Sequence, residues 1–258
     1  MNDLTPLEIK GKASSRVLHF FWLLDVSGSM AGKKIEMLNW AIREVIPSLE
    51  EIEDNERITI MMRVIAFDEE AWWHIGPDAI PLNEFFDHWE DLKAGSYTNT
   101  AEAIEMLTNE LDASKMGKRN VPPVCILISD GYCTSGDDKY KSAIDKLDSI
   151  PWGKKAVRLS IGIKDTNYDY NKDELDMFVS PYLKDTENAV ETLHADNPKK
   201  LLNYIKTAST TASVSASRSN SSADGKLLDS KPVHIDKGML EEESIVDDLS
   251  IDDAGEVF

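Results

Sequence analysis

The stretch that decides the fold runs from Val17 to Ser29, with the sequence V-L-H-F-F-W-L-L-D-V-S-G-S. Its first eight residues are apolar or aromatic apart from His19, which is typical of a strand buried on both faces. Asp25, Ser27 and Ser29 follow directly and place one carboxylate and two hydroxyl groups at alternate positions. Open α/β sheets bind ligands at the carboxyl ends of their strands. This loop is therefore predicted to belong to a binding site.

Composition and charge limit the classes of protein to consider. A chain of 258 residues, 41% of them hydrophobic, can bury a substantial core. The net charge of −19 argues against a nucleic-acid partner, because phosphate contacts need surplus Lys and Arg. The sequence shows neither a signal peptide nor an apolar stretch of the roughly 18 residues that span a membrane, so we expect a cytoplasmic protein with no membrane partner. Cys125 and Cys133 are expected to be free thiols.

Strands and helices alternate along the chain. Beyond the first strand, apolar periodicity predicts strands at 58–67, 71–75, 124–128 and 157–163, the first two forming a hairpin at a sheet edge. It predicts helices at 35–52, 104–111, 140–150, 175–179 and 198–205, with a short helix between 77 and 93. The expected class is α/β: a doubly wound, mostly parallel central sheet with one antiparallel edge strand and helices on both faces.

Two further polar segments are expected at the same edge of the sheet. Thr98 precedes a predicted helix, and Asp130 follows the strand at 124–128. A D-x-S-x-S sequence alone is equally typical of a turn with a helix cap, but the three segments together indicate a metal site. Oxygen donors without His or Cys favour Mg²⁺, with Mn²⁺ or Ca²⁺ as alternatives, and zinc is not expected.

This combination resembles the von Willebrand factor A (vWA) domain and its metal-ion-dependent adhesion site (MIDAS), over residues 17–216. The resemblance implies a Rossmann-like fold and a metal site made of Asp25, Ser27, Ser29, Thr98 and Asp130. By the same resemblance, the two serines and the threonine contact the ion, and the two aspartates act largely through water.

The threonine segment departs from the family pattern. Many relatives have Gly-Gly before the threonine, whereas Ser96 and Tyr97 stand there in this chain, and Thr100 offers a second hydroxyl. Thr98 is preferred, because it leaves Ala103 and Ile104 where the family has small and apolar helix residues.

Within the family, the chain resembles the bacterial TerY-like proteins, which are associated with tellurite resistance and stress. Asp25-Val26-Ser27-Gly28-Ser29-Met30, Gly32-Lys33-Lys34-Ile35-Glu36 and Ile65-Ala66-Phe67-Asp68 carry this narrower resemblance. It implies a bacterial stress, tellurite-resistance or phage-defence signalling module, with a Ser/Thr kinase and a PP2C-type phosphatase as partners.

Two functions are weighed. The expected one is a non-enzymatic adaptor, in which a protein partner supplies an Asp or Glu to the metal, since neutral hydroxyl ligands leave the ion electrophilic. The alternative is a metal-dependent phosphoryl-transfer or hydrolytic enzyme, which needs an added nucleophile or base and a cationic group. The three segments contain neither, and Gly32-Lys33-Lys34 lacks the spacing of a phosphate-binding loop.

The domain organisation follows from changes in composition. We expect an N-terminal extension at 1–15, the vWA domain at 16–216, and a disordered tail at 217–258 that is first Ser-rich and then acidic. Three roles remain open for the tail: occupation of the metal in cis by a tail carboxylate, phosphorylation within 209–222, or solubility alone.

Overall fold

The structure is a computed structural model. It describes residues 16–116, 121–131, 133–134, 136–164, 170–184, 189–219 and 235; for residues 137 and 216–219 it describes the backbone only. The predicted N-terminal extension lies outside these residues, as does the predicted tail except for 217–219 and Ile235. Both domain boundaries therefore stay predictions.

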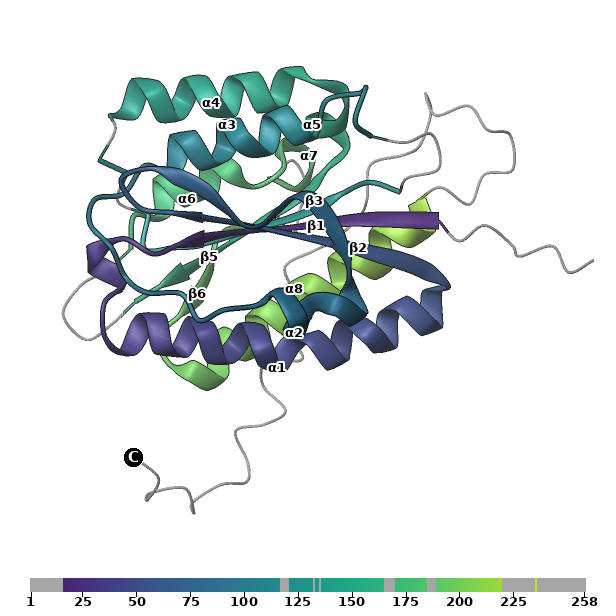
Figure 1. Ribbon diagram of the computed structural model, residues 1–258. Coiled ribbons are helices and arrows are strands. Elements are labelled where there is room, and N and C mark those ends of the chain that lie inside the picture. Colours follow the sequence, from purple (N-terminus) through teal and green to yellow (C-terminus); the bar gives the residue numbers. More distant parts are fainter. Residues whose placement is uncertain are drawn as a thin grey trace, which may run out of the picture.

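Six strands form one mixed sheet in the order β3-β2-β1-β4-β5-β6. All neighbours are parallel except β2 and β3, which form the predicted antiparallel hairpin at one edge (Figure 1). This arrangement confirms the predicted α/β class. The strands are β1 (Arg16–Asp25), β2 (Ile58–Phe67), β3 (Ala71–Pro81), β4 (Val124–Ser129), β5 (Val157–Ile163) and β6 (Leu193–Ala195).

Helices cover both faces of this sheet (Figure 1). One layer contains α1 (Lys33–Glu56), η2 (Leu82–Glu84), α2 (Phe85–His88) and α8 (Pro198–Ser219), and the other contains α3 (Thr100–Glu110), α4 (Asp137–Ser149) and α6 (Lys172–Phe178). The remaining short helices are η1 (Gly28–Met30), α5 (Pro151–Lys155) and α7 (Pro181–Lys184). Among the described residues, no helix is long and apolar enough to cross a membrane.

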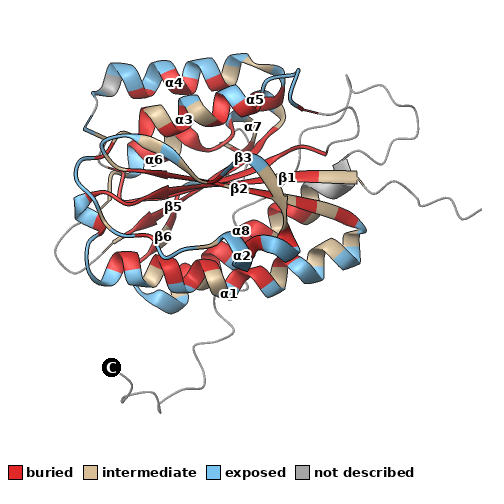
Figure 2. Ribbon diagram, viewed as in Figure 1, coloured by how far each residue is buried: buried red, intermediate tan, exposed pale blue. Residues whose placement is uncertain are grey.

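β1 is the central element of the core, as its sequence predicts. Phe20, Trp22 and Leu24 face the α1 and α8 layer, whereas Phe21 and Leu23 face α3 and α4, and all five are fully buried. Figure 2 shows that the strands of the sheet are largely buried between the two helical layers. Because side chains alternate across a strand, only an unbroken apolar run can be buried on both faces.

The last helix is much longer than its predicted extent of 198–205. It continues through a stretch rich in Ser and Thr to Ser219, because Ala208 and Ala212 share its buried face with Ile205 and the helix packs against α1. The same core cluster contains Ile235, which is fully buried although it lies in the predicted tail.

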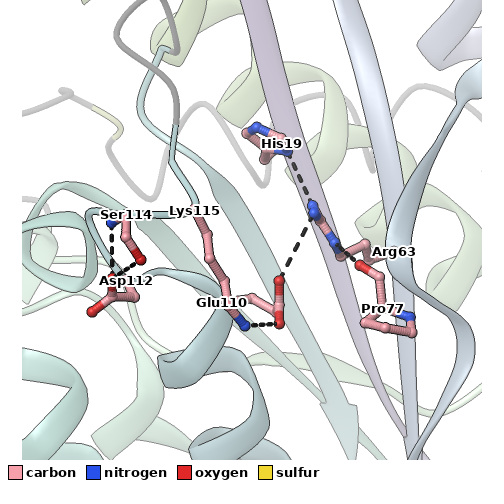
Figure 3. Close-up of polar contacts among 7 residues, drawn as sticks. All are labelled: His19, Arg63, Pro77, Glu110, Asp112, Ser114 and Lys115. Carbon is pink, nitrogen blue, oxygen red and sulfur yellow. Dashed lines mark hydrogen bonds and ion pairs between the residues drawn. The ribbon is translucent and has the colours of Figure 1, made fainter.

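A polar network lies at the C-terminal end of α3 (Figure 3). Arg63 of β2 donates from Nη1 to His19 Nδ1 at 3.1 Å and from Nε to the Pro77 carbonyl at 2.7 Å. Its guanidinium also lies 3.9 Å from Glu110, which pairs with Lys115. This network joins β1, β2, β3 and α3.

Candidate metal site

Strand register brings the three predicted segments together at the carboxyl edge of the sheet. β1 and β4 are parallel neighbours with Leu24 opposite Ile128, so Asp25, the last residue of β1, and Asp130, which directly follows β4, lie at the same edge of the sheet. The segment before α3 is held against the first loop by two backbone hydrogen bonds. Gly28 N donates to Ser96 O at 2.6 Å, and Gly95 N donates to Val26 O at 2.5 Å.

Two carboxylates are buried in this site. Asp25 is 0% exposed; its Oδ1 accepts from Ser27 N at 2.8 Å and its Oδ2 from Ser129 Oγ at 2.5 Å. Asp130 is 1% exposed, and its Oδ1 has no hydrogen-bond partner within the described part of the chain. Burial, followed by the nearby Asp130 charge, raises the pKa of Asp25 to about 6. Two buried like charges are costly, so this arrangement favours a cation.

The hydroxyl groups lie at the same edge. Ser27 is buried and Ser29 is exposed, and their Oγ atoms are 3.0 Å apart, so the pair runs from the interior to the surface. Thr98 is buried; its carbonyl accepts from Thr134 N at 2.8 Å and from Thr134 Oγ1 at 2.9 Å. Thr100 is buried too, and its Oγ1 has no partner among the described residues. The preference for Thr98 over Thr100 remains a prediction.

Lys34 lies beside the candidate site but is not among the residues predicted from the sequence. It lies in the first turn of α1, is 3% exposed, and places Nζ 3.5 Å from Asp130 Oδ2. The three predicted polar segments do not include Lys34, and Gly32-Lys33-Lys34 lacks the spacing of a phosphate-binding loop. The apolar face of α1 was the available indication, because Lys34 lies four residues before buried Leu38 and so on the same face of the helix.

Helix α6 positions the loop after Asp130. Asn171 N donates to the Asp130 carbonyl at 2.9 Å, and the buried Glu174 carboxylate accepts from Cys133 N at 3.0 Å. Gly131 has φ of +73°, and a Cβ there would lie 2.8 Å from Asn171 O. The close approach of α6 therefore requires glycine, although sequence spacing gave no indication that α6 takes part.

The donor set fits a small, hard divalent cation. Among the described residues, the buried Asp25 and Asp130 carboxylates and the buried Lys34 ammonium have a summed charge of minus one. Within the described ranges, no three His, Cys, Asp or Glu side chains gather as a metal site, so a cation held here would need further oxygen donors, such as the Ser27 and Ser29 hydroxyl groups. Mixed carboxylate and hydroxyl donors suit Mg²⁺ better than zinc.

Comparison with protein-family models identifies the family of this chain. Residues 21–213 match the von Willebrand factor type A domain model. The chain belongs to the von Willebrand factor type A family. The match begins within β1 and ends within α8, so it spans the vWA sheet and all three polar segments. A search of curated proteins found no match.

Solved structures share the vWA fold at low identity. A von Willebrand factor type A protein from Catenulispora acidiphila is 16% identical, with a TM-score of 0.58 over 77% of this chain and 43% of that one. The ArnB paralog VWA2 from Sulfolobus acidocaldarius is 19% identical, with a TM-score of 0.52 over 74% and 44%. Proximal thread matrix protein 1 from the mussel byssus, with zinc in its MIDAS motif, is 14% identical, with a TM-score of 0.54 over 77% and 46%. This chain thus spans less than half of each.

Proposed function

We propose that this vWA protein is a metal-dependent interaction module that binds an acidic side chain of a partner protein. Ser27, Ser29 and Thr98 would contact the cation, with Asp25 and Asp130 acting largely through water. The observation that carries the proposal is the buried pair Asp25 and Asp130, which lies at the carboxyl edge beside one cation, Lys34.

The chemistry of the donors supports recognition of an anion. Hydroxyl ligands are neutral, and carboxylates held through water donate less charge than direct ligands, so the bound ion stays electrophilic. Mg²⁺ prefers six oxygen ligands and usually retains waters. With Mg²⁺ held by these residues, an Asp or Glu of the partner would be bound at the carboxyl edge, and the partner's binding would depend on the metal.

Mg²⁺ is the proposed ion, with Mn²⁺ or Ca²⁺ as alternatives. The mussel relative holds zinc in its MIDAS motif, so zinc belongs in any test of this chain. The donor chemistry nevertheless favours the harder ions, because neither His nor Cys is among the proposed ligands.

The proposed setting is a cytoplasmic bacterial stress, tellurite-resistance or phage-defence module. The partners proposed there are a Ser/Thr kinase and a PP2C-type phosphatase. The support for this setting is the TerY-like resemblance of the stretch from Asp25 to Glu36. The acidic balance of the chain, −19, agrees with protein partners and not with nucleic acid.

A metal-dependent phosphoryl-transfer or hydrolytic enzyme remains the second candidate. One observation favours it: Lys34 supplies the cationic group that the three polar segments lack. Assays with a phosphomonoester in Mg²⁺ or Mn²⁺ separate the two functions. Turnover that is lost in Asp25→Ala would establish the enzyme, whereas the interaction module requires no turnover.

The proposed function is tested by metal-dependent capture of partners. Wild type and the double variant Ser27→Ala/Ser29→Ala are each co-expressed with the proposed kinase and phosphatase and used as bait. Each capture is carried out once with Mg²⁺ and once with EDTA. Ser114→Ala/Ser149→Ala is the matched control, since both of these serines are exposed and lie outside the site. Partners should be retained only by wild type and control in Mg²⁺. Equal retention by the site variant, or in EDTA, would contradict the proposal.

A further inference from the structure

The burial of Lys34 is unusual for a lysine and calls for a reason. Its side chain is 4% exposed and its partner Asp130 is 2% exposed, with Nζ and Oδ2 3.5 Å apart. Lysine is almost never fully buried unless it is paired, because removing an ammonium group from water is costly. A long, flexible side chain at the start of α1 would reach water at little cost, as exposed Lys33 does. The fold therefore holds a fixed positive charge inside the site.

That charge decides the electrostatic balance of the loaded site. Asp25 and Asp130 contribute two negative charges and Lys34 one positive charge, so these three described side chains and a divalent cation sum to plus one. Without Lys34, the two carboxylates would neutralise the same cation. A neutral site has little need of an external anion, whereas a site with net charge plus one attracts one carboxylate.

We propose that Lys34 is a specificity-determining residue that weakens cation binding and strengthens capture of the partner's carboxylate. The inference rests on the proposed function of the site. Lys34 does not act as a metal ligand here. The Lys34 ammonium repels the cation and competes with the cation for Asp130. The same positive charge attracts the carboxylate of the partner. Both effects are large because charges within a buried site are weakly screened.

The two effects have opposite signs, which makes the inference testable. Cation affinity is measured from the free Mn²⁺ signal in electron paramagnetic resonance, for wild type, Lys34→Met and Lys33→Met. Lys33→Met removes the same charge one residue away at an exposed position, so it controls for the overall charge of the protein. Lys34→Met should bind Mn²⁺ roughly tenfold more tightly or better, and Lys33→Met within about twofold of wild type.

Anion capture is measured on the Mn²⁺-loaded proteins. A peptide with blocked termini and a single glutamate is titrated into each protein, and water proton relaxation reports the displacement of water from the metal. The same peptide with glutamine in place of glutamate is the negative control. Lys34→Met should bind the glutamate peptide at least about threefold more weakly than wild type. Lys34→Arg keeps the positive charge, so its affinities for Mn²⁺ and for the glutamate peptide should both stay close to those of the wild type.

Folding and the proposed function are tested separately from the role of Lys34. If loss of the buried pair destabilises Lys34→Met, Mn²⁺ must raise its melting temperature by more than it raises that of wild type. Equal or weaker Mn²⁺ binding by folded Lys34→Met, or unchanged peptide affinity, overturns the role of Lys34 alone. If wild type itself binds no Mn²⁺, the proposed function fails and this inference fails with it.

Discussion

Replacement of His19 by asparagine should remove part of the pH dependence of stability. His19 Nδ1 lies 3.1 Å from Arg63 Nη1, and a guanidinium can only donate, so the imidazole must accept (Figure 3). Burial, followed by the Arg63 charge, lowers the pKa of His19 from 6.5 to about 4. Glu110 and Lys115, the other charged groups of this network, contact Arg63 or one another and not the imidazole.

The sign of the effect follows from the direction of the pKa shift. Between the folded and unfolded pKa values of His19, the unfolded chain binds more protons, so the free energy of unfolding falls as the pH falls. The contribution is complete above about pH 6.5 and is lost toward about pH 4. With these two pKa values, the free energy of unfolding should fall by about 2 kcal/mol between about pH 7 and about pH 5. This figure is an upper value, because the His19 side chain is partly exposed.

Urea unfolding in EDTA, followed by tryptophan fluorescence, measures this loss in wild type and His19→Asn. Asparagine can still accept from Arg63 but does not titrate. The stability difference between the two proteins should change by about 2 kcal/mol between the two pH values. Asp25 titrates in an overlapping range with the opposite sign, but its contribution is common to both proteins and cancels. Parallel pH profiles of wild type and His19→Asn would refute the reasoning.

Three further substitutions test the core and the candidate site. Ile235→Ala should lower the free energy of unfolding by about 2–4 kcal/mol in urea titrations, because removal of this fully buried side chain leaves a cavity in the core. An unchanged free energy of unfolding would mean that Ile235 contributes nothing to the fold. Gly131→Ala should cost about 1–3 kcal/mol, because its positive φ and the nearby Asn171 carbonyl both oppose a side chain; wild-type stability in thermal unfolding would contradict this. Under the proposed function, saturating Mg²⁺ should stabilise the wild type by about 2.7 kcal/mol at 100 times the Kd, and Asp130→Asn should abolish this stabilisation. A Mg²⁺-induced shift in melting temperature that is retained in Asp130→Asn would remove Asp130 from the site.

The predictions from sequence succeeded where the decisive pattern was local. The unbroken apolar run of β1, the alternation of β2 and the helical periodicity of α1 each identify their element from neighbouring residues. The short elements were missed: β6 has three residues, and α5 and α7 have five and four, too few for a period to show. The serine-rich end of α8 was misjudged, because its composition resembles a linker while packing against α1 determines its structure.

For the candidate site, the sequence by itself determined which loops carry oxygen donors, because each loop directly follows or precedes an element with its own apolar pattern. Parallel pairing of β1 with β4 then brought Asp25 and Asp130 to one edge, as the α/β class implies. Only the tertiary structure decided what surrounds them. Lys34 and Asp130 are 96 residues apart in the chain, and the pairing of their charges depends on how α1 packs against the sheet, which no sequence spacing encodes.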